Sequence, residues 1–286
     1  MIIMPSLKQY LEKLGLRAGK SSLSSEAAEA LKLALKEAAE EQKRNRKEIE
    51  QLRKTLEQRL GSFTPEALAR PGTMAGILRR LHQHGPRFET IIDIGASDAQ
   101  WTKLAMQSFP QHRYLMVEAQ PVHDATLKTF ASSHPNVQVV MAAAGAAQGE
   151  IHFDATDPFG GQASDKPYAA NNIVVPVTTL DHEVASRALP GPFLIKFDTH
   201  GFEMPILKGS AQVLQQTSVI IMECYNFKIS PDCLIFPEMC AHLQSLGFRC
   251  IDMADVMHRN YDQALWQMDL VFVRADRPEV AHLGFN

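Results

Sequence analysis

The chain has 286 residues, of which 45% are hydrophobic, and its formal net charge is −3. This length suits one large α/β domain with an appendage, and the slightly negative charge does not favour a general polyanion binder. The four cysteines include no pair at C-x-x-C spacing, which disfavours a zinc knuckle and is typical of a reducing cytosol. No apolar run approaches the roughly 20 residues of a membrane span, and the N-terminus carries no long apolar region. We therefore expect a cytoplasmic protein without a transmembrane segment or signal peptide.

Residues 1–62 differ in composition from the rest, and we interpret them as an N-terminal helical segment. Residues 24–60 are rich in good helix formers, with Ser24 or Ser25 as a candidate N-cap and Gly61 as a stop. A heptad seam of modest quality runs along this helix, at Leu31, Leu35, Ala38, Gln42, Asn45, Ile49, Leu52 and Leu56. The helix either packs as a solvated amphipathic helix on its own domain or forms a coiled coil. The second alternative predicts a homo-oligomer assembled through this segment.

Residues 63–286 form the second predicted part, in which helices and strands alternate. Strands are expected at 90–95, 114–119, 137–144, 193–198, 219–224, 248–253 and 268–275. Helices are expected at 73–84, 99–109, 122–133, 203–215 and 237–246, with an irregular insert before residue 193. This alternation predicts an α/β fold with a mostly parallel sheet covered on both faces. Ligands bind such sheets beyond the carboxyl ends of the strands.

The first strand ends in D-I-G-A-S-D, residues 93–98. Gly95 permits a tight turn and a close approach of the backbone to a ligand. The stretch is not G-x-G-x-x-G, and no G-K-[ST] follows, so neither a dinucleotide pyrophosphate nor a P-loop nucleotide is favoured. Carboxylates at Asp93 and Asp98 would repel a phosphate. They suit a ligand with an amino group or a positive charge.

The second strand ends in an acid, Glu118, which lies 23 positions after Gly95. An acid at about this distance can accept hydrogen bonds from both ribose hydroxyls, although a surface carboxylate that caps the next helix is the alternative. A ribose contact without a pyrophosphate cradle favours S-adenosylmethionine over NAD. We expect the cofactor to be bound by Asp93, Gly95, Ala96, Ser97, Asp98, Gln100, Trp101, Glu118, Ala119, Gln120, Ala142, Ala143 and Asp198.

The chain resembles the FkbM family of methyltransferases over residues 73–275. The resemblance is carried, in order, by "TIIDIGASDAQWT", "VEAQP", "VPVTTLD", "IKFDTHGFEMPILKGS" and "IIMEC". It departs from the family where Ala99 replaces a usual Gly and where His200 replaces the Glu of many members. The resemblance implies a Rossmann-like class I methyltransferase fold, with a mostly parallel seven-stranded sheet whose last strand is antiparallel. It also implies O-methylation of a hydroxyl, often on a sugar or a glycosylated product.

Three residues are candidates for the chemistry: His200, Asp198 and Glu223. His200 follows the fourth strand, and its unperturbed pKa of about 6.5 suits removal of a hydroxyl proton; the alternative is that it only orients the loop. Asp198 could orient His200, contact the cofactor or bind a metal. We expect Glu203 to act structurally, because a carboxylate is favourable at a helix N-terminus.

Asp198 and Glu223 end what should be adjacent strands, with Asn226 nearby. Their oxygens could hold Mg²⁺, which would lower the pKa of an acceptor hydroxyl, or they could simply line a polar pocket. Residues 156–172 are rich in Gly, Pro, Asn and Asp, and we expect a lid at the same edge of the sheet.

The expected partner is a small-molecule or glycan acceptor. No basic patch with interleaved aromatic residues indicates nucleic acid. Two other functions remain open at this point: an NAD-binding oxidoreductase with a Rossmann fold, and a non-catalytic assembly protein that keeps only the methyltransferase fold.

Overall fold

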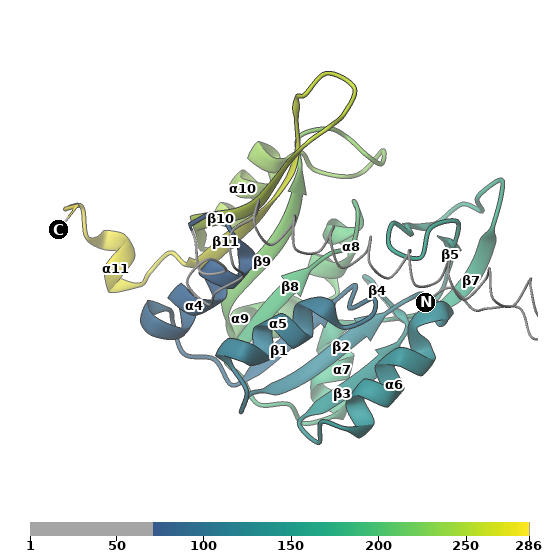
Figure 1. Cartoon of the computed structure of the whole chain (residues 1–286), viewed down its shortest axis with the longest axis horizontal. Helices are drawn as coiled ribbons and strands as arrows, with labels where there is room; N and C mark the ends of the chain where they lie inside the picture. Colours follow the sequence, from purple (N-terminus) through teal and green to yellow (C-terminus); the bar gives the residue numbers. More distant parts are fainter. Residues whose placement is uncertain (1–70, 286) are drawn as a thin grey trace, which may run out of the picture. The chain divides into compact units, whose positions relative to one another are not determined.

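One seven-stranded sheet organises the computed structural model, which describes residues 71–285 (Figure 1). Its strands are, in spatial order, β10 (Phe248–His258), β11 (Leu265–Arg274), β9 (Thr217–Tyr225), β8 (Phe193–Phe197), β1 (Thr90–Ile94), β2 (Arg113–Glu118) and β3 (Val137–Met141). Only β11 runs antiparallel to its neighbours in this sheet. The mostly parallel sheet with its last strand antiparallel is therefore confirmed.

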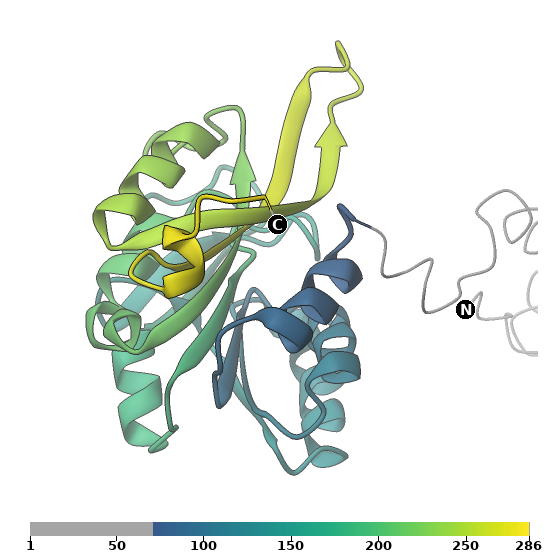
Figure 2. The same cartoon turned by 90° about the vertical axis from the view of Figure 1, so that its left-hand side faces the viewer.

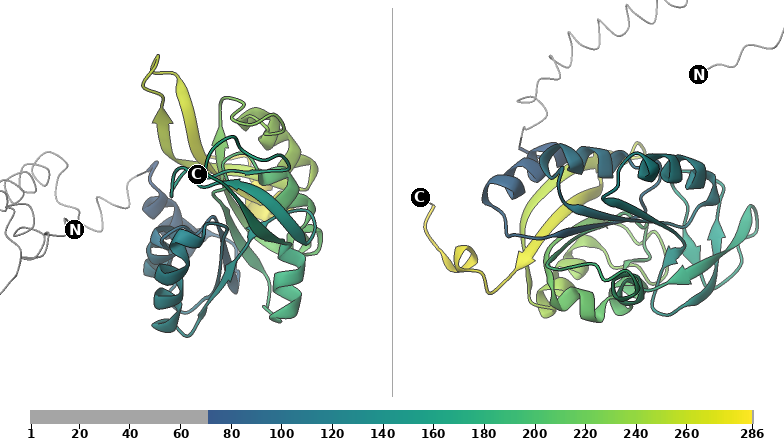
Figure 3. Two further views of the ribbon diagram at one scale, coloured as in Figure 1. Left: turned by 90° about the vertical axis from the view of Figure 1, so that its right-hand side faces the viewer. Right: turned by 90° about the horizontal axis from the view of Figure 1, so that it is seen from below.

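Helices cover both faces of the sheet (Figure 3). One face packs against α4 (Met74–His84), α5 (Gln100–Ser108) and α6 (Asp124–Ser132), which follows the short η1 (Pro121–His123). The other face packs against α7 (Leu180–Ser186), α8 (Glu203–Lys208), α9 (Ala211–Gln215) and α10 (Phe236–Ser245), and α11 (Pro278–Ala281) follows the last strand. Ile91 and Ile92 are both fully buried, one in each core, because successive side chains of a strand point to opposite faces. Burial on both faces explains the continuous apolar character of the strands.

The insert between β3 and β8 is not irregular, and this part of the sequence prediction is wrong. It forms a second sheet, in the order β4 (Ala143–Ala144), β7 (Asn172–Thr178), β5 (Gly149–Asp154) and β6 (Ala163–Ser164). The predicted strand at 137–144 divides, because Ala143 and Ala144 leave the main sheet to pair with β7. Alternating residues of these strands bury a small core of Ala143, Ile151, Phe153 and Val175.

The helix predicted at 203–215 is two short helices, α8 and α9. The chain breaks at Gly209, where a Cβ atom would lie 2.0 Å from the carbonyl oxygen of Gly145. Asp181 then accepts hydrogen bonds from the backbone N–H groups of Gln212 and Val213 at the start of α9. This close backbone approach and the capping carboxylate are long-range features that helix propensity does not report.

The predictions for the N-terminal helical segment, its coiled coil and the boundary at residues 62 and 63 lie outside the described residues. Within residues 71–285, no helix is long and apolar enough to cross a membrane.

A buried carboxyl ties the first strand to the helix that follows it. Asp93 is 1% exposed, and its Oδ2 accepts a hydrogen bond of 2.6 Å from Oγ1 of Thr102, which is also buried. Burial raises the pKa of Asp93 to about 7, against the lowering effects of the Thr102 hydrogen bond and the Lys196 charge. The carboxyl is therefore partly protonated near neutral pH.

This raised pKa predicts a pH dependence of stability. Because the folded protein holds the Asp93 proton more tightly than the unfolded chain, this contribution is fully present below the unfolded pKa near 4 and is lost as the pH rises towards 7. The loss amounts to a few kcal/mol, at about 1.4 kcal/mol for each pKa unit. Urea unfolding of the wild type and of Asp93→Asn should show a stability difference that shifts in favour of the variant between pH 4 and pH 7. A difference that stays constant over this range would contradict the assignment.

Candidate active site

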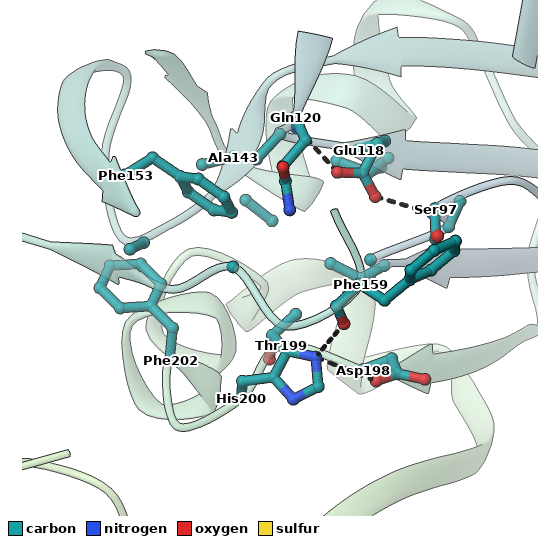
Figure 4. Close-up of a pocket in the computed structure, with 18 of the residues that line it drawn as sticks. Ser97, Glu118, Gln120, Ala143, Phe153, Phe159, Asp198, Thr199, His200 and Phe202 are labelled. Atoms are coloured by element: carbon teal, nitrogen blue, oxygen red, sulfur yellow. Dashed lines mark hydrogen bonds and ion pairs between the residues drawn. The ribbon is translucent and has the colours of Figure 1, made fainter. Parts of the chain in front are cut away.

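A cavity of about 380 Å³ lies at the carboxyl ends of β1, β2 and β8, between the main sheet and the small second sheet (Figure 4). Its size falls within the range of small-molecule sites. Every residue expected to bind the cofactor lines this cavity except Asp93, whose side chain lies behind β1 against Thr102. The lining residues among those expected are Gly95, Ala96, Ser97, Asp98, Gln100, Trp101, Glu118, Ala119, Gln120, Ala142, Ala143 and Asp198.

Glu118 is fixed at one side of the cavity by backbone donors. Its Oε2 accepts a hydrogen bond of 2.7 Å from the N–H of Ser97, and its Oε1 accepts one of 2.7 Å from the N–H of Gln120. The residue is 6% exposed. Each carboxylate oxygen has a second lone pair, so Glu118 can still accept hydrogen bonds from a ligand.

The loop after β1 reaches this geometry through left-handed backbone conformations. Gly95 has φ of +79°, and a Cβ atom there would lie 1.9 Å from the carbonyl oxygen of Asp198. Ala99, which replaces the usual Gly of the family, has φ of +67°. This left-handed conformation costs a non-glycine residue roughly 1–2 kcal/mol. Alanine, with a single methyl group, has the smallest side chain after glycine.

Aromatic and small residues form the apolar part of the wall. Phe153 of β5 and Phe202 before α8 lie on one side of the cavity, near Ala143 (Figure 4). Trp101 also lines it, and its indole Nε1 is buried with no hydrogen-bond partner among the described residues. The cavity thus combines one anchored carboxylate with flat, apolar surfaces.

The predicted lid, residues 156–172, reaches this cavity, and its first turn is held there by side chains. Nε2 of Gln120 donates to the carbonyl oxygens of Asp157 and Pro158 at 2.9 and 3.0 Å. Nε2 of His123 is 2.8 Å from the same Pro158 oxygen. The Phe159 ring lies in front of the cavity and is 64% exposed (Figure 4).

Asp198, His200 and Glu223 come together at the other end of the cavity. Nδ1 of His200 lies 3.3 Å from Oε2 of Glu223, and Nε2 lies 3.9 Å from Oδ1 of Asp198. The Tyr225 hydroxyl donates to Oε2 of Glu223 at 2.7 Å and lies 2.7 Å from Nδ1 of His200. Of the three, Glu223 does not line the cavity itself.

His200 is arranged as an imidazolium. Tyr225 donates to Glu223, so its hydroxyl oxygen accepts from Nδ1 of His200, while Nε2 lies 3.1 Å from the carbonyl oxygen of Phe159. Both ring nitrogens therefore face acceptors. Burial alone lowers the pKa of His200, but the hydrogen bond and charge of Glu223, followed by the charge of Asp198, outweigh it and raise the pKa to about 9. The unperturbed pKa assumed from the sequence does not hold here.

A buried lysine that the sequence analysis overlooked supports this cluster. Lys196 is 2% exposed, and its Nζ lies 3.2 Å from Oδ2 of Asp198 and 3.1 Å from Oδ1 of Asp269. Burial alone lowers the pKa of Lys196, but the charges of Asp198, Asp269 and Glu223 raise it above its usual value. The sequence does contain a signal for this residue, because a lysine within an apolar, buried strand requires a charged partner.

Lys196 and His200 in turn act on Asp198. Burial alone raises the pKa of Asp198, but the charges of these two cations hold it below its usual range. The lowered pKa means that this carboxylate is charged, and its side chain, 37% exposed, is accessible from the cavity.

The remaining polar residues have structural contacts. Oε1 of Glu203 accepts from the N–H of Gly201 at 2.8 Å and from Oγ1 of Thr199 at 3.1 Å, which fixes the turn after β8. Nδ2 of Asn226 donates to the carbonyl oxygen of Leu265 and so holds the β11 strand.

One ligand atom from each of Asp198, His200 and Glu223 lies within 4.8 Å of the others, the spacing of a metal site. In this arrangement protein donors already hold the carboxylates: Lys196 bonds Asp198, and Tyr225 and Gln267 bond Glu223. Mg²⁺ takes near-octahedral oxygen ligands, whereas this set offers a nitrogen and lies against a buried cation. These residues fit Mg²⁺ poorly.

Comparisons with solved structures return methyltransferases of low similarity. A precorrin-6y C5,15-methyltransferase of Geobacter metallireducens is 12% identical with a TM-score of 0.38, over 70% of this chain and 87% of that one. A 1,6-didemethyltoxoflavin-N1-methyltransferase of Burkholderia thailandensis, solved with bound 1,6-didemethyltoxoflavin and S-adenosylhomocysteine, is 13% identical with a TM-score of 0.38, over 70% of this chain and 76% of that one. No curated protein matches the sequence.

A family model gives the assignment. The model of the methyltransferase FkbM domain matches residues 93–250, which contain the Glu118 loop, the segment 156–172 and the Asp198–His200–Glu223 cluster. This match spans more than half of the chain. The protein therefore belongs to the FkbM family of S-adenosylmethionine-dependent methyltransferases.

Proposed function

We propose that the protein transfers a methyl group from S-adenosylmethionine to a hydroxyl oxygen, most readily of a sugar in a glycan, glycolipid or glycosylated metabolite. The observation that carries this proposal is the position of Asp198. Its carboxylate is charged, 37% exposed and at the edge of the cavity. A hydroxyl is a nucleophile that must lose a proton, and Asp198 is placed to accept it.

The cavity fits S-adenosylmethionine in size and in chemistry. Glu118 can accept hydrogen bonds from ribose hydroxyls, and the apolar walls at Ala143, Phe153 and Phe202 suit a flat purine. Asp98 lines the same cavity and suits a positively charged amino group. When bound, the cofactor supplies an electrophilic methyl group on a sulfonium.

Asp198 serves as the proton acceptor in this proposal. A carboxylate with a low pKa is a weak base towards an alcohol, but an alcohol oxygen becomes a strong acid as it gains a methyl group, so a weak base suffices late in the reaction. Oδ2 of Asp198 is held by Lys196, while Oδ1 lies beyond hydrogen-bond distance from His200. His200, as an imidazolium, balances the charges of Asp198 and Glu223 and orients the loop. The alternative role of His200, as the base, requires loss of its proton and of its contact to Phe159.

Two other functions are tested by ligand binding. Calorimetry of the full chain with S-adenosylmethionine and with NAD separates them, because an oxidoreductase would bind NAD alone. A non-catalytic assembly protein would bind neither ligand. The proposal expects binding of S-adenosylmethionine alone.

The proposed activity is tested directly with labelled S-adenosylmethionine and a panel of glycosides, with mass spectrometry of the products. We expect an O-methylated sugar. Methylation of nitrogen or carbon acceptors, with no transfer to any hydroxyl, would contradict the proposal.

The role of Glu118 predicts a binding defect in Glu118→Gln. The amide removes the charge and turns an NH₂ group towards a backbone donor that the carboxylate satisfies. We expect the Kd for S-adenosylmethionine to rise at least about tenfold, which corresponds to ~1.4 kcal/mol. Glu150→Gln, at an exposed residue of β5, is the matched control and should bind normally. An unchanged Kd for S-adenosylmethionine in a Glu118→Gln variant with a normal thermal melt would show that Glu118 does not bind the ribose.

The roles of Asp198 and His200 are separated by Asp198→Asn and His200→Gln. Loss of a proton acceptor costs about 10²–10⁴-fold in rate, so we expect Asp198→Asn to lose at least a hundredfold in single-turnover methyl transfer. His200→Gln should lose less, and the wild-type rate should stay flat between pH 6 and pH 8. If His200 were the base, the wild-type rate would climb with pH towards its pKa of about 9, and His200→Gln would be the more damaged variant.

The poor fit for Mg²⁺ predicts an activity that needs no divalent cation. Exhaustive EDTA treatment followed by gel filtration should leave methyl transfer unchanged. A loss of activity that Mg²⁺ restores would instead assign Asp198 and Glu223 as metal ligands.

A further inference from the structure

The hairpin of β10 and β11 extends beyond the body of the main sheet (Figure 2). The pairing of β11 with β9 begins at Gln267, so Leu265, Trp266 and the turn before them project past the end of the paired region. The turn itself spans residues 259–264. Because β9 also carries Glu223, the base of the hairpin lies next to the Asp198–His200–Glu223 cluster.

A series of ring contacts leads from His200 into this hairpin. The Tyr225 hydroxyl lies 2.7 Å from Nδ1 of His200, and the Tyr225 ring meets Trp266 edge-on at 5.8 Å. Phe227 stacks on Trp266 at 5.5 Å with an interplanar angle of 26°. The Arg259 guanidinium lies 3.9 Å from the Phe227 centroid and 5.6 Å from that of Tyr261. We call Tyr225, Phe227, Trp266 and Tyr261 the hairpin aromatic cluster.

The outer part of the hairpin aromatic cluster is open to solvent. Tyr261 is 91% exposed, whereas Phe227 and Trp266 are partly exposed. A ring as exposed as Tyr261 contributes little to folding. Exposed apolar surface beside a polar cavity is typical of an interaction site. Phe159, 64% exposed, is joined to His200 through its carbonyl oxygen, so exposed rings lie near both sides of the charge cluster.

The charges around the cluster decide which ligand it suits. Both ends of the Arg259 guanidinium donate to the Asp262 carboxylate, at 2.7 and 2.6 Å, so this cation is neutralised. On the side of the active site, the hydroxyl of Tyr225 contacts the Glu223 carboxylate, and the Asp198 carboxylate lies near Glu223. A single-stranded nucleic acid or a phosphorylated sugar requires a basic groove along its phosphates, and this surface would repel them.

We propose that the hairpin aromatic cluster is an acceptor subsite that binds an uncharged sugar ring and discriminates against phosphate-bearing acceptors. The flat rings of Trp266 and Tyr261 suit the apolar C–H face of a pyranose, while the hydroxyls of that sugar remain free towards solvent. This inference rests on the proposed O-methyltransferase function for the identity of the reacting hydroxyl. The proposed stacking of the sugar ring on the hairpin does not depend on which reaction the enzyme catalyses.

The test measures glycan binding by the full chain saturated with S-adenosylhomocysteine, on an array of neutral, sulfated, sialylated and phosphorylated glycans. We expect neutral glycans to be retained. Tyr261→Ser removes one stacking ring and should weaken binding by about tenfold, as should Trp266→Leu. Phe285→Ser, at a fully exposed ring of the C-terminus, is the matched control and should bind as the wild type does. The Kd for S-adenosylmethionine should be unchanged in all three variants.

Several results would overturn the subsite: retention of no neutral glycan, preference for anionic glycans, or unchanged glycan binding in both Tyr261→Ser and Trp266→Leu. A Trp266→Phe variant that keeps binding shows that a ring, and not the hairpin packing alone, is required. The two proposals fail separately. Binding through the hairpin without any methyl transfer would remove the O-methyltransferase function alone, whereas methyl transfer with an unchanged acceptor KM in both Tyr261→Ser and Trp266→Leu would remove the subsite alone.

Discussion

The site depends on a buried charge, the ammonium group of Lys196. A cation at 2% exposure is tolerated only with close carboxylate partners, because the cost of removing it from water is otherwise several kcal/mol. One partner, Asp198, directly follows β8, the strand of Lys196, and the other, Asp269, lies on β11. The antiparallel insertion of β11 places Asp269 directly opposite Glu223 of β9. Asp269 therefore shares the charge of Lys196 with Asp198, and it is Lys196 and His200 that keep Asp198 charged at the edge of the cavity.

Around this ion pair, positive and negative groups alternate across three strands. Lys196 holds Asp198, His200 lies between Asp198 and Glu223, and Gln267 of β11 donates to Glu223. His200 reaches its place through a left-handed backbone with φ of +48°, followed by Gly201 at +94°. Such a conformation is unfavourable for a bulky side chain, and the Glu203 contacts to Gly201 and Thr199 restrain the turn against relaxation.

The sequence was most informative where a signal is local. Apolar strands predicted the main sheet, and the loop after the first strand together with the acid 23 positions after Gly95 predicted half of the residues that line the cavity. The second sheet was missed because β4 and β6 have only two residues each and because β7 contains Pro176, which argues against a strand when read alone. The pKa of His200 could not be predicted, since it is set by Glu223 and Asp198, neither of whose distances a sequence reports. Asp93 does not line the cavity, because its side chain is turned towards Thr102 of α5, a contact that the strand pattern does not report.

The segment of residues 156–172, which we predict to be a lid, contacts both halves of the site. Its carbonyl groups contact Gln120 and His123, which follow the Glu118 strand, and also His200, which follows the Lys196 strand. The Phe159 carbonyl oxygen lies at hydrogen-bond distance from Nε2 of His200 and can accept a hydrogen bond from it. The other ring nitrogen, Nδ1, contacts the Tyr225 hydroxyl. If this predicted lid moved away from the cavity, an imidazolium N–H would be exposed beside the Asp198 carboxylate. A donor and an acceptor next to each other suit a hydroxyl group, which needs both, better than they suit a carbon nucleophile.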